Sequence, residues 1–146
     1  MKIDQYTLKD NLTTYLKNKI GFLKLSEIIN EIEIAGEGNM NVVLRIKTNK
    51  RTFILKQSRP FVQKYPHLPA PIDRIDVEKK FYDLMDQNSF FPKILGYLPS
   101  DYILLLEDLG KGEDLTSLYI TRRITSDLIK EFTLGLYYIH KKKAPI

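Results

Sequence analysis

The chain has 146 residues and a mass of 17.1 kDa, which suffices for one compact domain or two small lobes. Hydrophobic residues make up 43% and charged residues 28%, a balance typical of globular proteins that argues against disorder. There is no cysteine, which excludes disulfides, thiolate catalysis and cysteine-ligated zinc. The longest apolar run, Tyr102 to Leu106, is far shorter than the ~20 residues of a membrane helix, and the N-terminus has no signal-peptide core. We therefore expect a cytoplasmic protein with no membrane contact.

The net charge of +5 is unevenly distributed. Residues 1–73 carry 12 Lys and Arg against 7 Asp and Glu, whereas residues 74–146 carry 11 of each. A basic half can serve a nucleic acid, an anionic surface or a phosphorylated ligand. The basic residues are scattered singly apart from Lys141 to Lys143, and no aromatic–basic platform accompanies them, so we expect no nucleic-acid binding. A nucleic-acid module stays an alternative, and salt-dependent binding of generic DNA would support it.

Apolar residues at helical spacing predict a helix over residues 7–20 with Thr7 as its cap, and a second short helix from Ser26. Alternating patterns then predict three strands: 32–34, 42–47 and 52–57. The segment Thr48 to Arg51 suits a hairpin turn because asparagine tolerates left-handed backbone angles.

Four prolines predict that residues 58–72 form a loop. The remaining predicted elements are a helix from Asp73 to about Gln87, strands over 94–97 and 102–106, and a helix from Ser126 to His140. Strands in adjacent hairpins with one intervening helix predict an α+β fold, in which one helix packs on a five-stranded antiparallel sheet.

The segment Gly36-Glu37-Gly38-Asn39-Met40-Asn41 joins two predicted strands. A dinucleotide-binding fingerprint needs a helix directly after its glycines, so this context argues against one. A glycine-rich hairpin lying over nucleotide phosphates fits the context better, since backbone amides can approach the oxygens. An ordinary tight turn with two glycines remains the simpler interpretation.

Lys56 and Glu78 form the second candidate feature. Lys56 ends an apolar strand, where it is either a solvated edge residue or the lysine that pairs with nucleotide phosphates in kinases. Glu78 lies in the middle of the helical stripe formed by Ile75, Tyr82 and Met85. A carboxylate facing a core needs a cationic partner, and Lys56 is the expected one. The alternative is a rotated helix with Glu78 half exposed.

The apolar strand Leu104-Leu105-Leu106 continues into Glu107-Asp108-Leu109-Gly110. This exit is either a simple loop or a hinge that offers backbone C=O and N–H groups to adenine. In the hinge interpretation, the two acidic side chains point outward and matter little.

In their order and spacing these features resemble the small-molecule kinase superfamily of aminoglycoside phosphotransferases, choline kinases, fructosamine kinases and methylthioribose kinase. The segment from Gly36 to Asn41 is similar to the G-x-G-N-x-N loop of methylthioribose kinase, and Lys56-Gln57 to its Lys-Gln pair. Asp73-Arg74 followed by Glu78 resembles its helix entry, whereas the segment from Leu104 to Gly110 is closer to the aminoglycoside phosphotransferases. The resemblance spans roughly residues 30–140 and implies a protein-kinase-like N-terminal lobe.

The resemblance also implies a nucleotide site for ATP with Mg²⁺. Its cofactor-binding residues would be Gly36, Gly38, Asn39, Asn41, Lys56, Glu78, Glu107 and Leu109. The domain division it implies is an N-terminal helical segment (1–30), the nucleotide-binding lobe (31–110) and a linker with the first helix of a C-terminal lobe (111–146).

The superfamily's catalytic H-x-D-x-x-x-x-N loop and its metal-binding aspartates belong to the C-terminal lobe. Neither His67 nor His140, the only histidines, is followed by x-Asp, so we assign no catalytic or metal-binding residue. The expected function is the ATP-binding lobe of a small-molecule O-phosphotransferase, a transferase that phosphorylates a sugar, an amino alcohol or an aminoglycoside, and this chain alone is expected to be inactive. The alternative is a non-catalytic binding or regulatory module, and an exposed apolar face would favour self-association.

Overall fold

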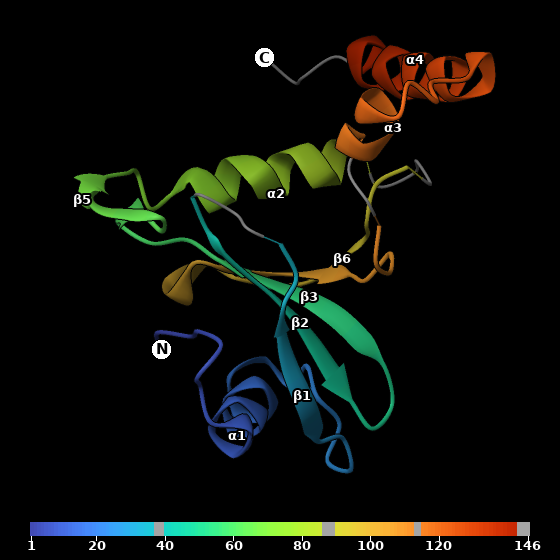
Figure 1. The fold of residues 1–146 in the computed structure, drawn as a ribbon. Helices are drawn as coiled ribbons and strands as arrows, with labels where there is room; N and C mark the ends of the chain where they lie inside the picture. The colour runs from blue at the N-terminus through green and yellow to red at the C-terminus, as the bar shows by residue number, and fades with distance from the viewer. Residues whose placement is uncertain (37–39, 86–89, 113–114, 143–146) are drawn as a thin grey trace.

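The computed structural model describes residues 1–36, 40–85, 90–112 and 115–142. Its helices and strands follow in the order α1 (Lys9–Ile20), β1 (Ile29–Ile34), β2 (Val42–Thr48), β3 (Thr52–Gln57), β4 (Phe61–Val62), β5 (Tyr65–Pro69), α2 (Arg74–Met85), β6 (Ile94–Leu98), η1 (Pro99–Asp101), β7 (Ile103–Glu107), α3 (Thr116–Ile120) and α4 (Ser126–Lys141). Five strands form one antiparallel sheet in the order β1-β2-β3-β7-β6, which confirms the predicted α+β class and the five-stranded sheet (Figure 1).

One face of this sheet packs on α1. Leu12 and Leu16 of the helix are buried together with Leu44, Leu55 and Leu105, which come from three different strands. Each fully buried side chain of this size contributes about 1.5–3 kcal/mol. The N-terminal helix therefore shares its core with the sheet.

The opposite face carries α2, so that the sheet lies between the two helices (Figure 1). Ile75 of α2 is buried with Leu104 and Leu106 of β7, and Ile54 and Tyr82 pack against them. Because successive residues of a strand point to opposite faces, β7 supplies Leu104 and Leu106 to this core and Leu105 to the other. A strand that is buried on both faces needs the continuous apolar run seen in the sequence.

Two local predictions in the first half of the chain are wrong, and the reason given for a third is wrong. Thr7 does not cap α1; its hydroxyl instead accepts a hydrogen bond from the Asp4 amide at 2.9 Å. No helix starts at Ser26, because the chain turns there and enters β1. The β2–β3 hairpin forms as predicted, but not through a left-handed asparagine: Asn49 has no positive φ, and its side chain bonds to the backbone of residues 26 and 28.

The proline-rich segment and the region before α4 also differ from the prediction. Residues 58–72 contain the small hairpin β4–β5, in which Phe61 pairs with Pro69 and Val62 with Tyr65. The helix α2 starts at Arg74, and the predicted helix end at residues 86–87 lies outside the described part of the chain. The sequence pattern after Gly112 is helical, most clearly from Ser126, and the short helix α3 falls in this region as a separate helix whose bounds five residues are too few to define.

The predicted C-terminal helix is present as α4. The Thr125 hydroxyl caps its start by accepting a hydrogen bond from the Leu128 amide at 3.2 Å. Its apolar side chains stay largely exposed: Ile129 is 55% exposed, Phe132 57% and Tyr137 54%. Of the helices that the structure describes, none combines the length and the apolar character required to cross a membrane.

Candidate functional site

The centre of the candidate site is an ion pair between Lys56 of β3 and Glu78 of α2. Lys56 pairs across the sheet with Val43 of β2 and Leu104 of β7. Strand alternation turns Phe53 and Leu55 toward α1 and Lys56 toward α2. The pairing predicted from the strand lysine and the helix carboxylate is confirmed.

Glu78 faces the sheet, so the alternative of a rotated helix is wrong. Its neighbours on the same stripe are buried Ile75, one turn earlier, and Tyr82, one turn later. Burial, together with the charge and hydrogen bonding of Glu78, raises the pKa of the Tyr82 hydroxyl to about 12. Glu78 therefore meets a neutral phenol and the Lys56 ammonium, and both side chains of the ion pair keep about a fifth of their surface exposed.

The predicted phosphate loop connects β1 and β2, which are antiparallel neighbours as the hairpin prediction requires. Gly36 and Asn41 lie at its two ends, whereas Gly38 and Asn39 lie outside the described residues. The Ala35 amide donates to the Val43 carbonyl at 3.0 Å and closes the pairing before the loop begins. A Cβ atom placed on Gly36 would meet no atom within 4 Å, so the side of Gly36 where a side chain would stand is open.

Asn41 does not point freely into this open space. Its side-chain oxygen accepts a hydrogen bond from Arg74 Nε at 2.8 Å and from the Ser58 hydroxyl at 3.3 Å. Arg74 also donates to the carbonyl oxygens of Met40 and Arg59. Arg74, the first residue of α2, thus holds the end of the loop by hydrogen bonds. The sequence did not indicate this role, because Arg74 lies 33 residues from Asn41.

The predicted hinge follows β7. The Glu107 amide already donates to the Lys93 carbonyl at 2.9 Å, so Glu107 can offer a ligand only its carbonyl oxygen. Leu109 is 62% exposed, and its amide makes no hydrogen bond to the part of the chain that the structure describes. Adenine presents an amino N–H donor and a ring-nitrogen acceptor on one edge, and the Glu107 carbonyl and the Leu109 amide could pair with these two groups.

The expectation that both acidic hinge side chains point outward is wrong. The Asp108 carboxylate turns inward and meets Arg45 of β2, with Nε–Oδ2 and Nη2–Oδ1 distances of 2.9 and 3.0 Å. The Glu107 carboxylate accepts a hydrogen bond from the Lys93 amide at 3.2 Å. Arg45 and Asp108 are 63 residues apart, and for that reason the local sequence could not indicate their contact.

A hollow of about 430 Å³ lies between the hinge and the first two strands. Its lining residues come from β1 and the residue after it, from β2 and from the segment after the hinge: Glu33, Ile34, Ala35, Arg45, Gly110, Lys111 and Gly112. Arg45 pairs with Ile54, two residues before Lys56 on β3, so this hollow opens on the Lys56 face of the sheet. At its rim, Glu33 lies 2.6 Å from Lys47 Nζ and 3.8 Å from Lys111 Nζ. The predicted lysine and the hinge hollow thus lie on the same face of the sheet, whereas Gly36 and Asn41 do not line this hollow.

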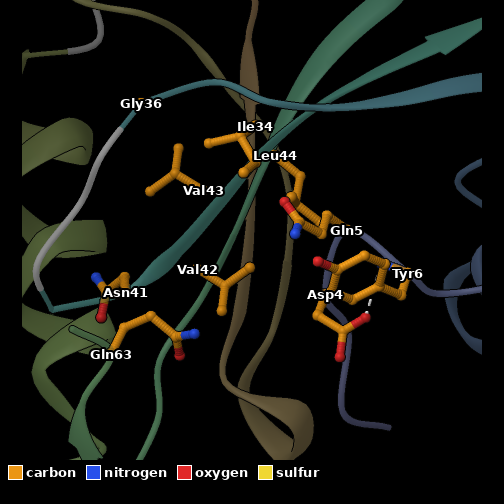
Figure 2. A pocket seen from close by; sticks show the side chains of 10 residues that line it. All are labelled: Asp4, Gln5, Tyr6, Ile34, Gly36, Asn41, Val42, Val43, Leu44 and Gln63. Carbon is orange, nitrogen blue, oxygen red and sulfur yellow. Dashed lines mark hydrogen bonds between the residues drawn. The ribbon is translucent and has the colours of Figure 1, made fainter. Parts of the chain in front are cut away.

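A second cavity, of about 390 Å³, lies behind the hairpin (Figure 2). Asp4, Gln5 and Tyr6 of the N-terminal segment form one side; residues of β1, β2 and the loop, together with Gln63 between β4 and β5, form the rest (Figure 2). Val42 and Leu44 in its wall belong to the core under α1, and Lys56 does not line this cavity. It borders Gly36 and Asn41 but does not bring them to the ion pair.

The described residues contain no group of three or more His, Asp or Glu side chains that could hold a metal ion. No family model matches the chain, and no curated protein matches it.

Proposed function

We propose that this chain is the ATP-binding lobe of a small-molecule O-phosphotransferase with a protein-kinase-like N-terminal lobe. The observation that carries the proposal is the Lys56–Glu78 ion pair, which joins the third strand to the helix on the face of the sheet where the hinge hollow opens. In protein kinases a strand lysine held by a helix glutamate orients the nucleotide phosphates. The strand–loop–strand context of Gly36 and the position of the hinge after β7 support the same assignment.

In this proposal each feature of the chain has one task. Backbone amides of the segment from Gly36 to Asn41 approach the phosphates, and Lys56 donates charge-assisted hydrogen bonds to them. Glu78 holds the Lys56 ammonium in place. The carbonyl of Glu107 and the amide of Leu109 bind the adenine edge. Mg²⁺-ATP supplies the transferable phosphoryl group, and this chain supplies binding and orientation.

The 146 residues by themselves are expected to bind ATP weakly at best and to transfer no phosphate to a small alcohol or sugar. Phosphoryl transfer needs a residue that positions the acceptor and metal ligands that neutralise charge. Neither histidine begins an H-x-D segment, and the described part of the chain groups no metal-binding carboxylates.

Titration of the protein with ATP and Mg²⁺, followed by amide NMR shifts up to millimolar nucleotide, tests the proposal. Lys56→Met should weaken binding about tenfold or more, because hydrogen bonds to charged groups contribute about 1.5–3 kcal/mol each. The matched control is Lys79→Met, which removes a half-buried lysine of α2 that pairs with Asp83 and lies over the Tyr97 ring. It should leave the affinity unchanged.

Two results would contradict the proposal. Absence of nucleotide-dependent shifts in the unmodified chain would favour the non-catalytic binding module. ADP release in the presence of small alcohols or sugars that disappears in Lys56→Met would mean that the chain holds a catalytic carboxylate of its own.

A further inference from the structure

Arg45 is the side chain through which β2 holds the hinge. Its guanidinium makes two parallel hydrogen bonds to Asp108, and Nη2 also donates to the Gly110 carbonyl at 2.7 Å. The Gly110 amide in turn donates to Asp108 Oδ1 at 3.0 Å. Residues 108 and 110 are thus joined to each other and to one strand residue 63 positions earlier.

This arrangement is shielded from water. The side chains of Arg45 and Asp108 are only 9% and 6% exposed, so solvent and salt screen their interaction little. Burial alone would raise the pKa of the Asp108 carboxyl, but hydrogen bonds from Arg45 and the Gly110 amide bring it below its ordinary value. The hydrogen bond to Asp108 raises the pKa of Arg45, despite burial. Both groups are therefore held in their charged forms.

The position of Arg45 separates it from the phosphate end of the candidate site. Val43, which pairs with Lys56, lies two residues earlier on β2, toward the loop. Both nitrogens of Arg45 that make these bonds are directed to the hinge, and Arg45 lines the hollow beside Gly110. This residue serves the hinge end of the hollow.

We infer that Arg45 and Asp108 are positioning residues that fix the hinge backbone for the base of the nucleotide. The inference rests on the proposed function. Asp108 is the residue between the Glu107 carbonyl and the Leu109 amide, so its side-chain bonds fix the peptide units that carry both groups. If the hinge backbone is already ordered before the ligand binds, binding loses no conformational entropy to order it. Ordering a single residue corresponds to roughly a tenfold change in affinity.

The test compares ATP with inorganic tripolyphosphate, which contains the phosphates but no base. The variants are Arg45→Lys, which keeps the charge but loses the two-pronged geometry, and Asp108→Asn, which keeps the shape but loses the charge. The chain offers a closely matched control. Arg51 donates Nε to the buried Glu27 at 3.0 Å and Nη2 to the Phe22 carbonyl at 2.8 Å. Its guanidinium lies over the rings of Phe22 and Phe53, on the α1 face of the sheet, opposite to Arg45. Arg51→Lys and Glu27→Gln therefore perturb an arginine–carboxylate pair on the other face of the sheet.

We expect the two hinge variants to bind ATP about tenfold more weakly and tripolyphosphate within twofold of the unmodified chain. Hydrogen exchange without ligand should accelerate at the Gly110 amide in Asp108→Asn and Arg45→Lys, and not in the control variants. Lys56→Met should instead weaken the binding of both ATP and tripolyphosphate, because it removes a contact to the phosphates.

The inference is overturned if ATP affinity stays within twofold in both hinge variants, or if ATP and tripolyphosphate weaken equally, which would indicate a general structural role. It is also overturned if the unmodified chain binds the two ligands equally well, because the hinge then binds no base; the phosphate half of the proposed function survives that result. Binding of neither ligand refutes the proposed function itself.

Discussion

The Glu78→Gln substitution separates a functional ion pair from a stabilising one. The Lys56 and Glu78 side chains are 19% and 22% exposed, so water screens their attraction, and we expect a loss of only about 0.5–1 kcal/mol in the free energy of unfolding. Nucleotide affinity should fall more noticeably. A lysine side chain carries about 2 kcal/mol of rotamer entropy. Without Glu78 the Lys56 side chain is ordered only when the nucleotide binds, and part of this entropy is then lost from the binding free energy. A loss of about 1 kcal/mol corresponds to roughly fivefold weaker binding.

A double-mutant cycle measures this dependence. ATP affinity and thermal stability are determined for the unmodified chain, Glu78→Gln, Lys56→Met and the double variant. If Glu78 acts through Lys56, the Glu78→Gln change should have no further effect on affinity in the Lys56→Met background. An equal loss in both backgrounds would refute this reasoning. So would a gain in affinity for Glu78→Gln, because repulsion between the carboxylate and the phosphates would then outweigh its effect on Lys56.

Three further predictions concern stability. Glu27→Gln should lower the free energy of unfolding by about 1–2 kcal/mol at pH 7, since Glu27 is buried whereas Arg51 is 38% exposed. Hydrogen bonds from Arg51 and Thr48 lower the Glu27 pKa despite burial, so the Glu27 carboxylate contributes its full stabilisation above about pH 4.3. In denaturant melts, the stability difference between Glu27→Gln and the unmodified chain should therefore shrink as the pH falls below that value. Leu105→Ala should cost about 2–5 kcal/mol by urea unfolding, because the side chain is completely buried in the core under α1, and a cost below 1 kcal/mol would contradict that packing. Thr125→Ala removes the hydroxyl that caps α4 and should destabilise this helix (residues 126–141) by about 1 kcal/mol, measured as faster amide hydrogen exchange. Thr121→Ala is the control and should leave the exchange rates of α4 unchanged.

Patterns within single elements were sufficient to predict most of the fold. The apolar alternation on both sides of Lys56 placed it on a strand, and the stripe of Ile75, Tyr82 and Met85 placed Glu78 on the inward face of a helix. An inward carboxylate must find a cation, so burial together with charge was enough to predict the ion pair. These inferences hold because each depends on side-chain periodicity or on the cost of an unpaired charge, and both are local properties.

The sequence by itself therefore determined the five strands of the sheet, the helices α1, α2 and α4, the sheet class and the partner of Glu78. Tertiary structure alone decided the inward turn of Asp108 and the attachment of Asn41 to Arg74. Both contacts join residues more than 30 positions apart. Asp108 reaches Arg45 only because β7 pairs with β3 and β3 with β2, which brings the hinge beside the middle of the second strand. An acidic residue just beyond a strand is solvated unless another element brings it a partner, and the strand order of the sheet determines which element that is.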